Sequence, residues 1–195
     1  MARPVKFEDT EVLDRATELF WKYGCDSVSI RDLEQGLDLR APSIYRRFQS
    51  KDRLVACCVD RYVKRVVGGR IRRLLDGADD PVEGLRSFFT SVLDPHPGER
   101  HPRGCLLTVT AGQATFQTPA VRSAVTAGFD TIEAALRSQL ERARTARQLS
   151  DHPDIDMLAK GLLVSFEGLL VLARSGSDGL ETSIDAIFAG LATST

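Results

Sequence analysis

Apolar residues recur at helical spacing through almost the whole of this 195-residue chain. Val12, Ala16, Leu19, Phe20 and Tyr23, for example, repeat at i, i+4, i+7, i+8 and i+11, which places them on one stripe of a helix. No segment alternates apolar and polar residues for long enough to indicate a β-strand. The pattern predicts an all-α fold of about nine helices, and the length suffices for a real hydrophobic core.

The expected helices follow from this spacing and from their start and stop signals. Ser29 stands three residues before Asp32 at the start of the second helix, and Pro42 suits the first turn of the third. Ser50 can cap the fourth. The expected ranges are about 12–23, 29–37, 42–48, 50–75, 82–93, 104–117, 119 to near 150, 155–174 and 184–191.

Charge divides the chain into two unlike parts, although the net charge is only -1. Residues 1–75 hold 16 Lys and Arg against 11 Asp and Glu, whereas the remaining residues hold 10 against 16. A basic N-terminal third joined to an acidic remainder is expected when one module meets a polyanion and the other does not. We therefore predict a DNA-binding domain at residues 1–52 and a second helical domain at residues 53–195.

Two short helices joined by a tight turn, the second carrying basic side chains, are typical of a helix-turn-helix. In the third expected helix, Ser43, Arg46 and Arg47 share one face, while Ile44 and Phe48 share another that can be buried. Arginine suits the O6 and N7 atoms of guanine, and Lys51 at a helix start suits phosphate. A solvated basic face on an ordinary helical domain would explain the charge but not the paired helices.

The segment "ATELFWKYGCDSVSIRDLEQGLDLRAPSIYRRFQSKDRL" resembles the N-terminal DNA-binding domain of the TetR family of bacterial transcriptional regulators. The residues that carry the resemblance are Leu19, Phe20, Gly24, Ser29, Ile30, Asp32, Leu33, Ser43, Ile44, Tyr45, Phe48, Ser50, Lys51 and Asp52. The resemblance implies a homodimeric, all-helical repressor that binds a palindromic operator in double-stranded DNA and is released by a small hydrophobic ligand.

The resemblance also implies roles for individual residues. Tyr45 and Lys51 would contact phosphates, Ser43 and Arg46 would approach bases, and Arg47 stands where the family often has a phosphate-binding His. Three positions depart from the family's pattern. Asp38 stands in the turn where the family usually has Gly, and Val28 stands where it usually has a helix-capping Thr. Arg40 stands where a small polar residue is common. The predicted DNA-binding residues are Ser29, Arg40, Ala41, Pro42, Ser43, Tyr45, Arg46, Arg47 and Lys51.

The C-terminal two-thirds supplies apolar residues for either a ligand pocket or a filled core. The candidate pocket residues are Phe89, Cys105, Val109, Gln113, Phe116, Phe129, Leu162, Ser165 and Phe166. The stretch "RGCLLTVTA" resembles a helix start found in some TetR subgroups. There Cys105 would be either a reactive thiolate, favoured by the helix dipole and Arg103, or a plain buried thiol.

The last two expected helices present more apolar surface than one subunit is expected to cover, which predicts a dimer interface. Its residues would be Phe166, Leu169, Leu170, Ala173, Ile184, Ile187, Phe188 and Leu191.

Two other functions are alternatives to a ligand-responsive repressor. One is a regulator whose C-terminal domain only dimerises or binds a protein partner. The other is a helical enzyme with a basic substrate site, which lacks a Ser/His/Asp set, a Gly-rich phosphate loop and H-E-x-x-H. We expect no cofactor and no metal, because Cys25, Cys57, Cys58 and Cys105 form no C-x-x-C pair. Without a signal peptide or membrane span, the protein is expected in the cytoplasm.

Overall fold

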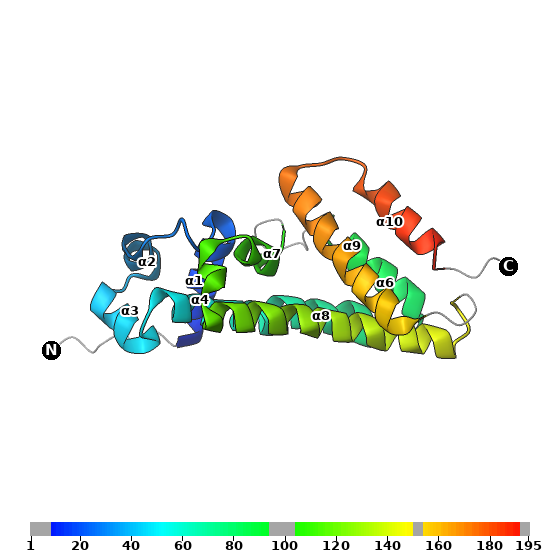
Figure 1. The fold of residues 1–195 in the computed structure, drawn as a ribbon, viewed down its shortest axis with the longest axis horizontal. Helices are drawn as coiled ribbons and strands as arrows, with labels where there is room; N and C mark the ends of the chain where they lie inside the picture. The colour runs from blue at the N-terminus through cyan, green and yellow to red at the C-terminus, as the bar shows by residue number, and fades with distance from the viewer. Residues whose placement is uncertain (1–8, 94–103, 150–153, 192–195) are drawn as a thin grey trace.

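The computed structural model describes residues 9–93, 104–149 and 154–191. Over these ranges the regular structure is helical, and it comprises nine helices when the segments from α4 to η2 are counted as one rod. The all-α prediction is confirmed. Figure 1 shows an elongated molecule with α1 to α3 at one end, α8 along its length, and α6, α9 and α10 toward the other end.

The N-terminal end consists of α1 (Asp9–Tyr23), α2 (Ile30–Leu37) and α3 (Ala41–Phe48). Ser29 caps α2 as predicted: its hydroxyl accepts a hydrogen bond from Asp32 N at 3.2 Å, and Ser29 N donates to the Asp32 carboxylate at 2.8 Å. The apolar stripes of the three helices meet in one core that includes Phe20, Leu33, Leu37 and Ile44. This core fixes α3 on the other two helices.

The turn between α2 and α3 has a left-handed backbone at Asp38, with φ 52° and ψ 42°. Asp tolerates this conformation better than most residues, so the turn forms without the family's glycine. Arg40 provides no side-chain cap for α3. Glu34 does so from α2, because its Oε1 accepts a hydrogen bond from Ala41 N at 2.7 Å. Glu34 thereby holds the angle between the two helices.

A long rod connects this end to the rest of the molecule. It comprises α4 (Lys51–Tyr62), a π-helical turn η1 (Val63–Val67), α5 (Gly68–Ile71) and a second π-helical turn η2 (Arg72–Asp76). The rod was predicted as one continuous helix, and the two π turns were not. Helix α4 contacts both α1 and α8, so it packs on both of the predicted domains. The domain division after residue 52 stays a prediction.

The C-terminal part contains α6 (Pro81–Thr90), α7 (Leu106–Ala111), the 3-10 turn η3 (Ala114–Gln117), α8 (Pro119–Thr145), α9 (Ile155–Ser175) and α10 (Leu180–Ala189). The helix predicted over 104–117 is shorter than expected. Gly112 ends α7, and Gln113 has an extended backbone with φ −113° and ψ 159° before η3 begins. The side chain of Gln113 is used elsewhere, as described below.

Helices α9 and α10 bury many of their apolar residues within their own subunit. Phe166 stacks on Phe88 with ring centroids 4.5 Å apart, and Phe89 lies 5.3 Å from both Phe166 and Phe188. Rings of α6 cover this part of the surface, and the predicted role of these residues in a dimer stays a prediction. Of the residues predicted at the dimer interface, Ile187 is half-buried, and those buried inside the chain are Phe166, Leu169, Leu170, Ala173, Ile184, Phe188 and Leu191.

Candidate nucleic-acid interface

The face of α3 turned away from the core carries the predicted DNA-binding side chains. Ile44 is 1% exposed and holds the helix down, whereas the next residue, Tyr45, is 44% exposed. The separation of a buried face from a polar face is as predicted. The predicted residues on and around α3 are exposed or half-buried: Arg40, Ala41, Pro42, Ser43, Tyr45, Arg46 and Arg47.

The start of α4 adds a second group of donors. Ser50 caps this helix by accepting a hydrogen bond from Arg53 N at 3.1 Å, and Lys51 is its first residue. The helix therefore begins with backbone N–H groups and an ammonium group together, which suits an anion such as phosphate. The Lys51 Nζ lies 3.5 Å from the carbonyl oxygen of Asp26.

Ser29 is exposed, but its hydroxyl has a partner within the protein. The Oγ atom lies 2.6 Å from Asp32 Oδ2, and the hydrogen bonds from Ser29 lower the pKa of the Asp32 carboxyl. Any DNA contact by Ser29 would have to share this hydroxyl with the capping box.

The predicted pocket residues divide between buried and half-buried positions. Phe89, Cys105, Leu162 and Phe166 are buried, and Phe89 contacts Phe166 in the aromatic cluster described above. The half-buried ones are Val109, Gln113, Phe116, Phe129 and Ser165. Gln113 was predicted in this pocket, and its amide oxygen accepts hydrogen bonds from Cys25 N at 2.6 Å and Asp26 N at 3.3 Å.

Cys105 precedes α7 and is buried beside Tyr62 and Glu167. Burial and the neighbouring Glu167 carboxyl raise the pKa of the Cys105 thiol to about 12. The thiol is therefore protonated at neutral pH, which supports the plain buried thiol over the reactive thiolate. Arg103, which was expected to favour the thiolate, lies outside the described residues.

Glu167 on α9 was not predicted as a site residue. One carboxylate oxygen accepts a hydrogen bond from the Thr108 hydroxyl, while Oε1 is buried and has no hydrogen-bond partner among the described residues. Burial raises the pKa of Glu167. The sequence did hold a signal, because Glu167 is the one acidic residue in the apolar run 158–173.

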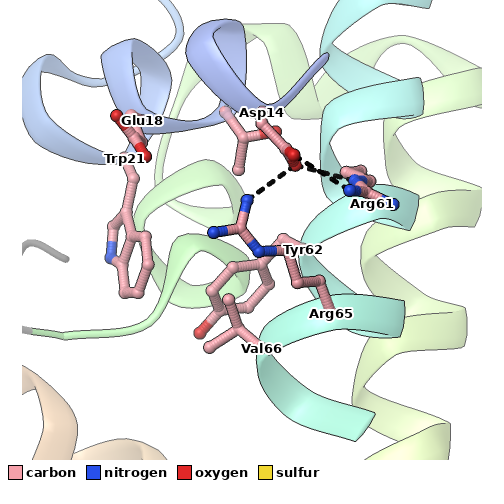
Figure 2. Close-up of a pocket in the computed structure, with 8 residues that line it drawn as sticks. Asp14, Glu18, Trp21, Arg61, Tyr62, Arg65 and Val66 are labelled. Carbon is pink, nitrogen blue, oxygen red and sulfur yellow. Dashed lines mark hydrogen bonds and ion pairs between the residues drawn. The ribbon is translucent and has the colours of Figure 1, made fainter. Parts of the chain in front are cut away.

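Figure 2 shows a small cavity nearby, where Trp21 of α1 meets Tyr62 of the rod. The two rings form an edge-to-face pair with centroids 4.9 Å apart. The cavity measures about 10 Å³, which is room for a single water and not for an effector.

The described residues contain no group of His, Cys, Asp and Glu that could hold a metal ion. None of the helices within those same ranges is long and apolar enough to cross a membrane.

Two family models match the chain and together span most of it. Residues 12–58 match the model for bacterial regulatory proteins of the tetR family, and residues 81–182 match the tetracyclin repressor-like C-terminal domain. The HTH-type transcriptional repressor ComR of Escherichia coli is 23% identical over 175 residues, which cover 90% of this chain and 83% of ComR.

Solved structures of similar proteins have the same fold. A cysteine mutant of the TetR family transcriptional regulator CifR, complexed with 26-bp double-strand operator DNA, matches with a TM-score of 0.84 at 27% identity. The match covers 96% of this chain and 98% of that one. The reduced form of NemR from E. coli matches with a TM-score of 0.83 at 20% identity, over 95% of this chain and 98% of that one, and so supports the fold alone.

Proposed function

The chain belongs to the TetR family of bacterial regulatory proteins and is a DNA-binding transcriptional regulator, and from this premise we propose that it is a homodimeric repressor of a palindromic operator. The family consists of transcription factors and not of enzymes. A regulator that binds bacterial DNA acts in the cytoplasm, and we keep that location as a prediction.

One observation carries the proposal for DNA recognition. Ile44 anchors α3 in the core, and this leaves Ser43 and Arg46 on the outer side of an eight-residue helix. An α-helix held in this way fits the major groove, where arginine discriminates guanine through its O6 and N7 atoms. Selection of duplexes from a random 30-bp pool, followed by gel shift, tests it. We expect enrichment of an inverted repeat, and enrichment of no sequence would contradict it.

The dimer is proposed to form through a stripe of α9 that stays uncovered within the subunit. Met157, Val164 and Val171 are 69%, 67% and 49% exposed, and Leu172 lies beside them at 45%. Gly161 and Gly168 share this stripe, and neither has another atom within 4 Å of where a Cβ would stand. An apolar helix face with small residues supports close packing of a second copy around a two-fold axis.

We further propose that a small hydrophobic ligand acts on the region around Glu167, Tyr62 and the aromatic cluster. A buried carboxylate oxygen without a partner supports a ligand that is apolar and carries one hydrogen-bond donor or positive charge. Trp21 is the one tryptophan in the chain and packs on Tyr62, so its fluorescence reports on this region.

A screen of cationic, neutral and anionic amphiphiles tests the ligand proposal. We expect compounds that change Trp21 fluorescence also to release the selected duplex. The alternative, in which the C-terminal domain only dimerises or binds a protein partner, predicts that no compound affects DNA binding while the dimer remains intact.

A further inference from the structure

Two loops distant in the sequence exchange hydrogen bonds at the junction between the N-terminal helices and the C-terminal part. The first loop precedes α2 and contains Cys25 and Asp26, and the second lies between α7 and η3. Gln113 Oε1 accepts hydrogen bonds from Cys25 N at 2.6 Å and from Asp26 N at 3.3 Å. In return, the Asp26 carboxylate accepts hydrogen bonds from Ala114 N at 2.6 Å and from Thr115 N at 3.1 Å. We call these contacts the latch.

The exchange follows from what each loop lacks. Gln113 is the N-cap residue of η3, yet its own side chain makes no capping hydrogen bond to that turn. The first N–H groups of a helical turn need acceptors, and Asp is a preferred one. Here Asp26 supplies the cap from the N-terminal part, so η3 is fully capped only while the two parts stay together. Hydrogen bonds of N–H groups to a carboxylate are also the stronger kind.

The turn η3 also forms a hydrogen bond with the residues that follow α3. The Thr115 hydroxyl donates to the Asp52 carboxylate at 3.1 Å, beside Lys51 at the start of α4. The segment from α2 to α3 therefore lies between two points that are both fixed to η3: the loop before α2 and the start of α4. Figure 1 shows α7 and the beginning of α8 beside α1 and α4 at this junction. A movement of α7 or α8 would displace both anchors of α3 at once.

We propose that Asp26 and Gln113 are positioning residues, and that their latch fixes the orientation in which the C-terminal part presents α3 to the operator. The claim rests on the proposed function, because it concerns DNA binding by a two-fold dimer. Neither side chain belongs to the face of α3. The helix-turn-helix units of the two subunits must enter successive major grooves together. A less fixed orientation of these units therefore weakens binding to the whole operator but not the contacts that one unit makes.

The test uses the full-length protein with Gln113→Ala, because Gln113 is neutral and lies outside the helix-turn-helix. Gln117→Ala is the matched control. Gln117 lies in the same turn, and its amide oxygen accepts its hydrogen bond from Arg122 on α8. Fluorescence anisotropy compares the selected duplex with a shorter duplex that holds one half of the repeat. We expect Gln113→Ala to weaken binding to the whole operator about tenfold or more, within the usual range of coupling factors. Binding to the half-site should stay within about twofold, and Gln117→Ala should behave as wild type.

Asp26→Ala provides an independent variant on the other side of the latch, and amide hydrogen exchange shows whether the latch opens. Each variant should speed exchange at residues 25–26 and 113–116 while the amides of α3 stay protected. The proposal is overturned if whole-operator binding is unchanged in both variants, or if half-site binding falls by the same factor. If wild-type protein selects no duplex, the proposed function fails, whereas hydrogen exchange still decides whether the two loops are latched.

Discussion

The Arg61 guanidinium donates two hydrogen bonds to the Asp14 carboxylate, with Nε and Nη2 at 2.7 and 2.9 Å from its two oxygens. Arg65 adds a third contact from the π turn at 2.8 Å. Figure 2 shows the Asp14 carboxylate of α1 between the guanidinium groups of Arg61 and Arg65 on the rod. This junction joins the first helix of the DNA-binding end to the element that continues into the C-terminal part.

Asp14→Asn should destabilise the protein at neutral pH by about 1 kcal/mol, at the low end for charged hydrogen bonds because the group is partly exposed and screened. The hydrogen bond from Arg61 is the main cause that lowers the Asp14 pKa from 3.8. The contribution is therefore full above about pH 4 and is lost as the pH falls through the lowered folded-state pKa. Urea unfolding at pH 7 and pH 3 measures this, with Asp130→Asn as the control. A variant as stable as wild type at pH 7 would contradict the expectation.

Arg46→Ala and Lys51→Ala should weaken DNA binding in different ways. Arg46 lies on the outer face of α3, so its loss should cost about 1 to 3 kcal/mol on the selected duplex and relax preference at one base pair. Lys51 lies at a helix start, so its loss should weaken binding to all sequences and lower the salt slope by about one unit. Titrations of specific and random duplexes at several salt concentrations measure both. Equal losses on the two duplexes for Arg46→Ala would remove its role in base recognition.

Val164→Glu and Phe166→Glu should have opposite outcomes although they are two residues apart. Val164 is 67% exposed, so its replacement should leave a folded monomer that no longer binds the whole operator tightly. Phe166 is 2% exposed within the subunit, and a carboxylate there would cost several kcal/mol and unfold the protein. Analytical ultracentrifugation and circular dichroism distinguish the two. An intact dimer for Val164→Glu would place the interface elsewhere.

Glu167→Gln should change how stability depends on pH. Burial raises the pKa of Glu167 above 4.5, so the folded state holds more protons than the unfolded state between that value and the raised pKa. Wild-type stability from this group is therefore present at low pH and lost as the pH rises through that range. The variant should gain stability relative to wild type between pH 4 and pH 8. An identical difference at the two pH values, measured by urea unfolding, would contradict this.

The sequence allowed the helix-turn-helix to be predicted in detail, because its signals are local. Ser29 and Asp32 are three residues apart, and Ile44 and Arg46 separate the faces of one short helix. By contrast, Gln113 lies 88 residues from Cys25, so no local pattern reveals that its side chain accepts a hydrogen bond from the loop before α2. The π turns also have no compositional signature, since they differ from an α-helix only in which carbonyl each N–H reaches.

The long apolar run of α9 likewise does not show which of its residues face a second subunit. A helix that is apolar on several faces is buried somewhere, but the pattern cannot distinguish cover by the same chain from cover by another. The structure separates the two: Phe166 faces α6, whereas Val164 faces outward. The same apolar run contained Glu167, whose isolated charge was the better indicator of an unusual environment.

Each π turn in the rod is equivalent to an α-helix with one residue inserted. Deleting one residue within 63–67 would let this part of the rod become a regular α-helix. In an uninterrupted helix, the same deletion would rotate every later residue about the helix axis by about 100°. The turns can therefore absorb a frame-preserving deletion that an uninterrupted helix could not. A library of in-frame deletions along the rod should show two narrow windows of tolerance, at η1 and η2, separated and flanked by positions where losing one residue abolishes repression.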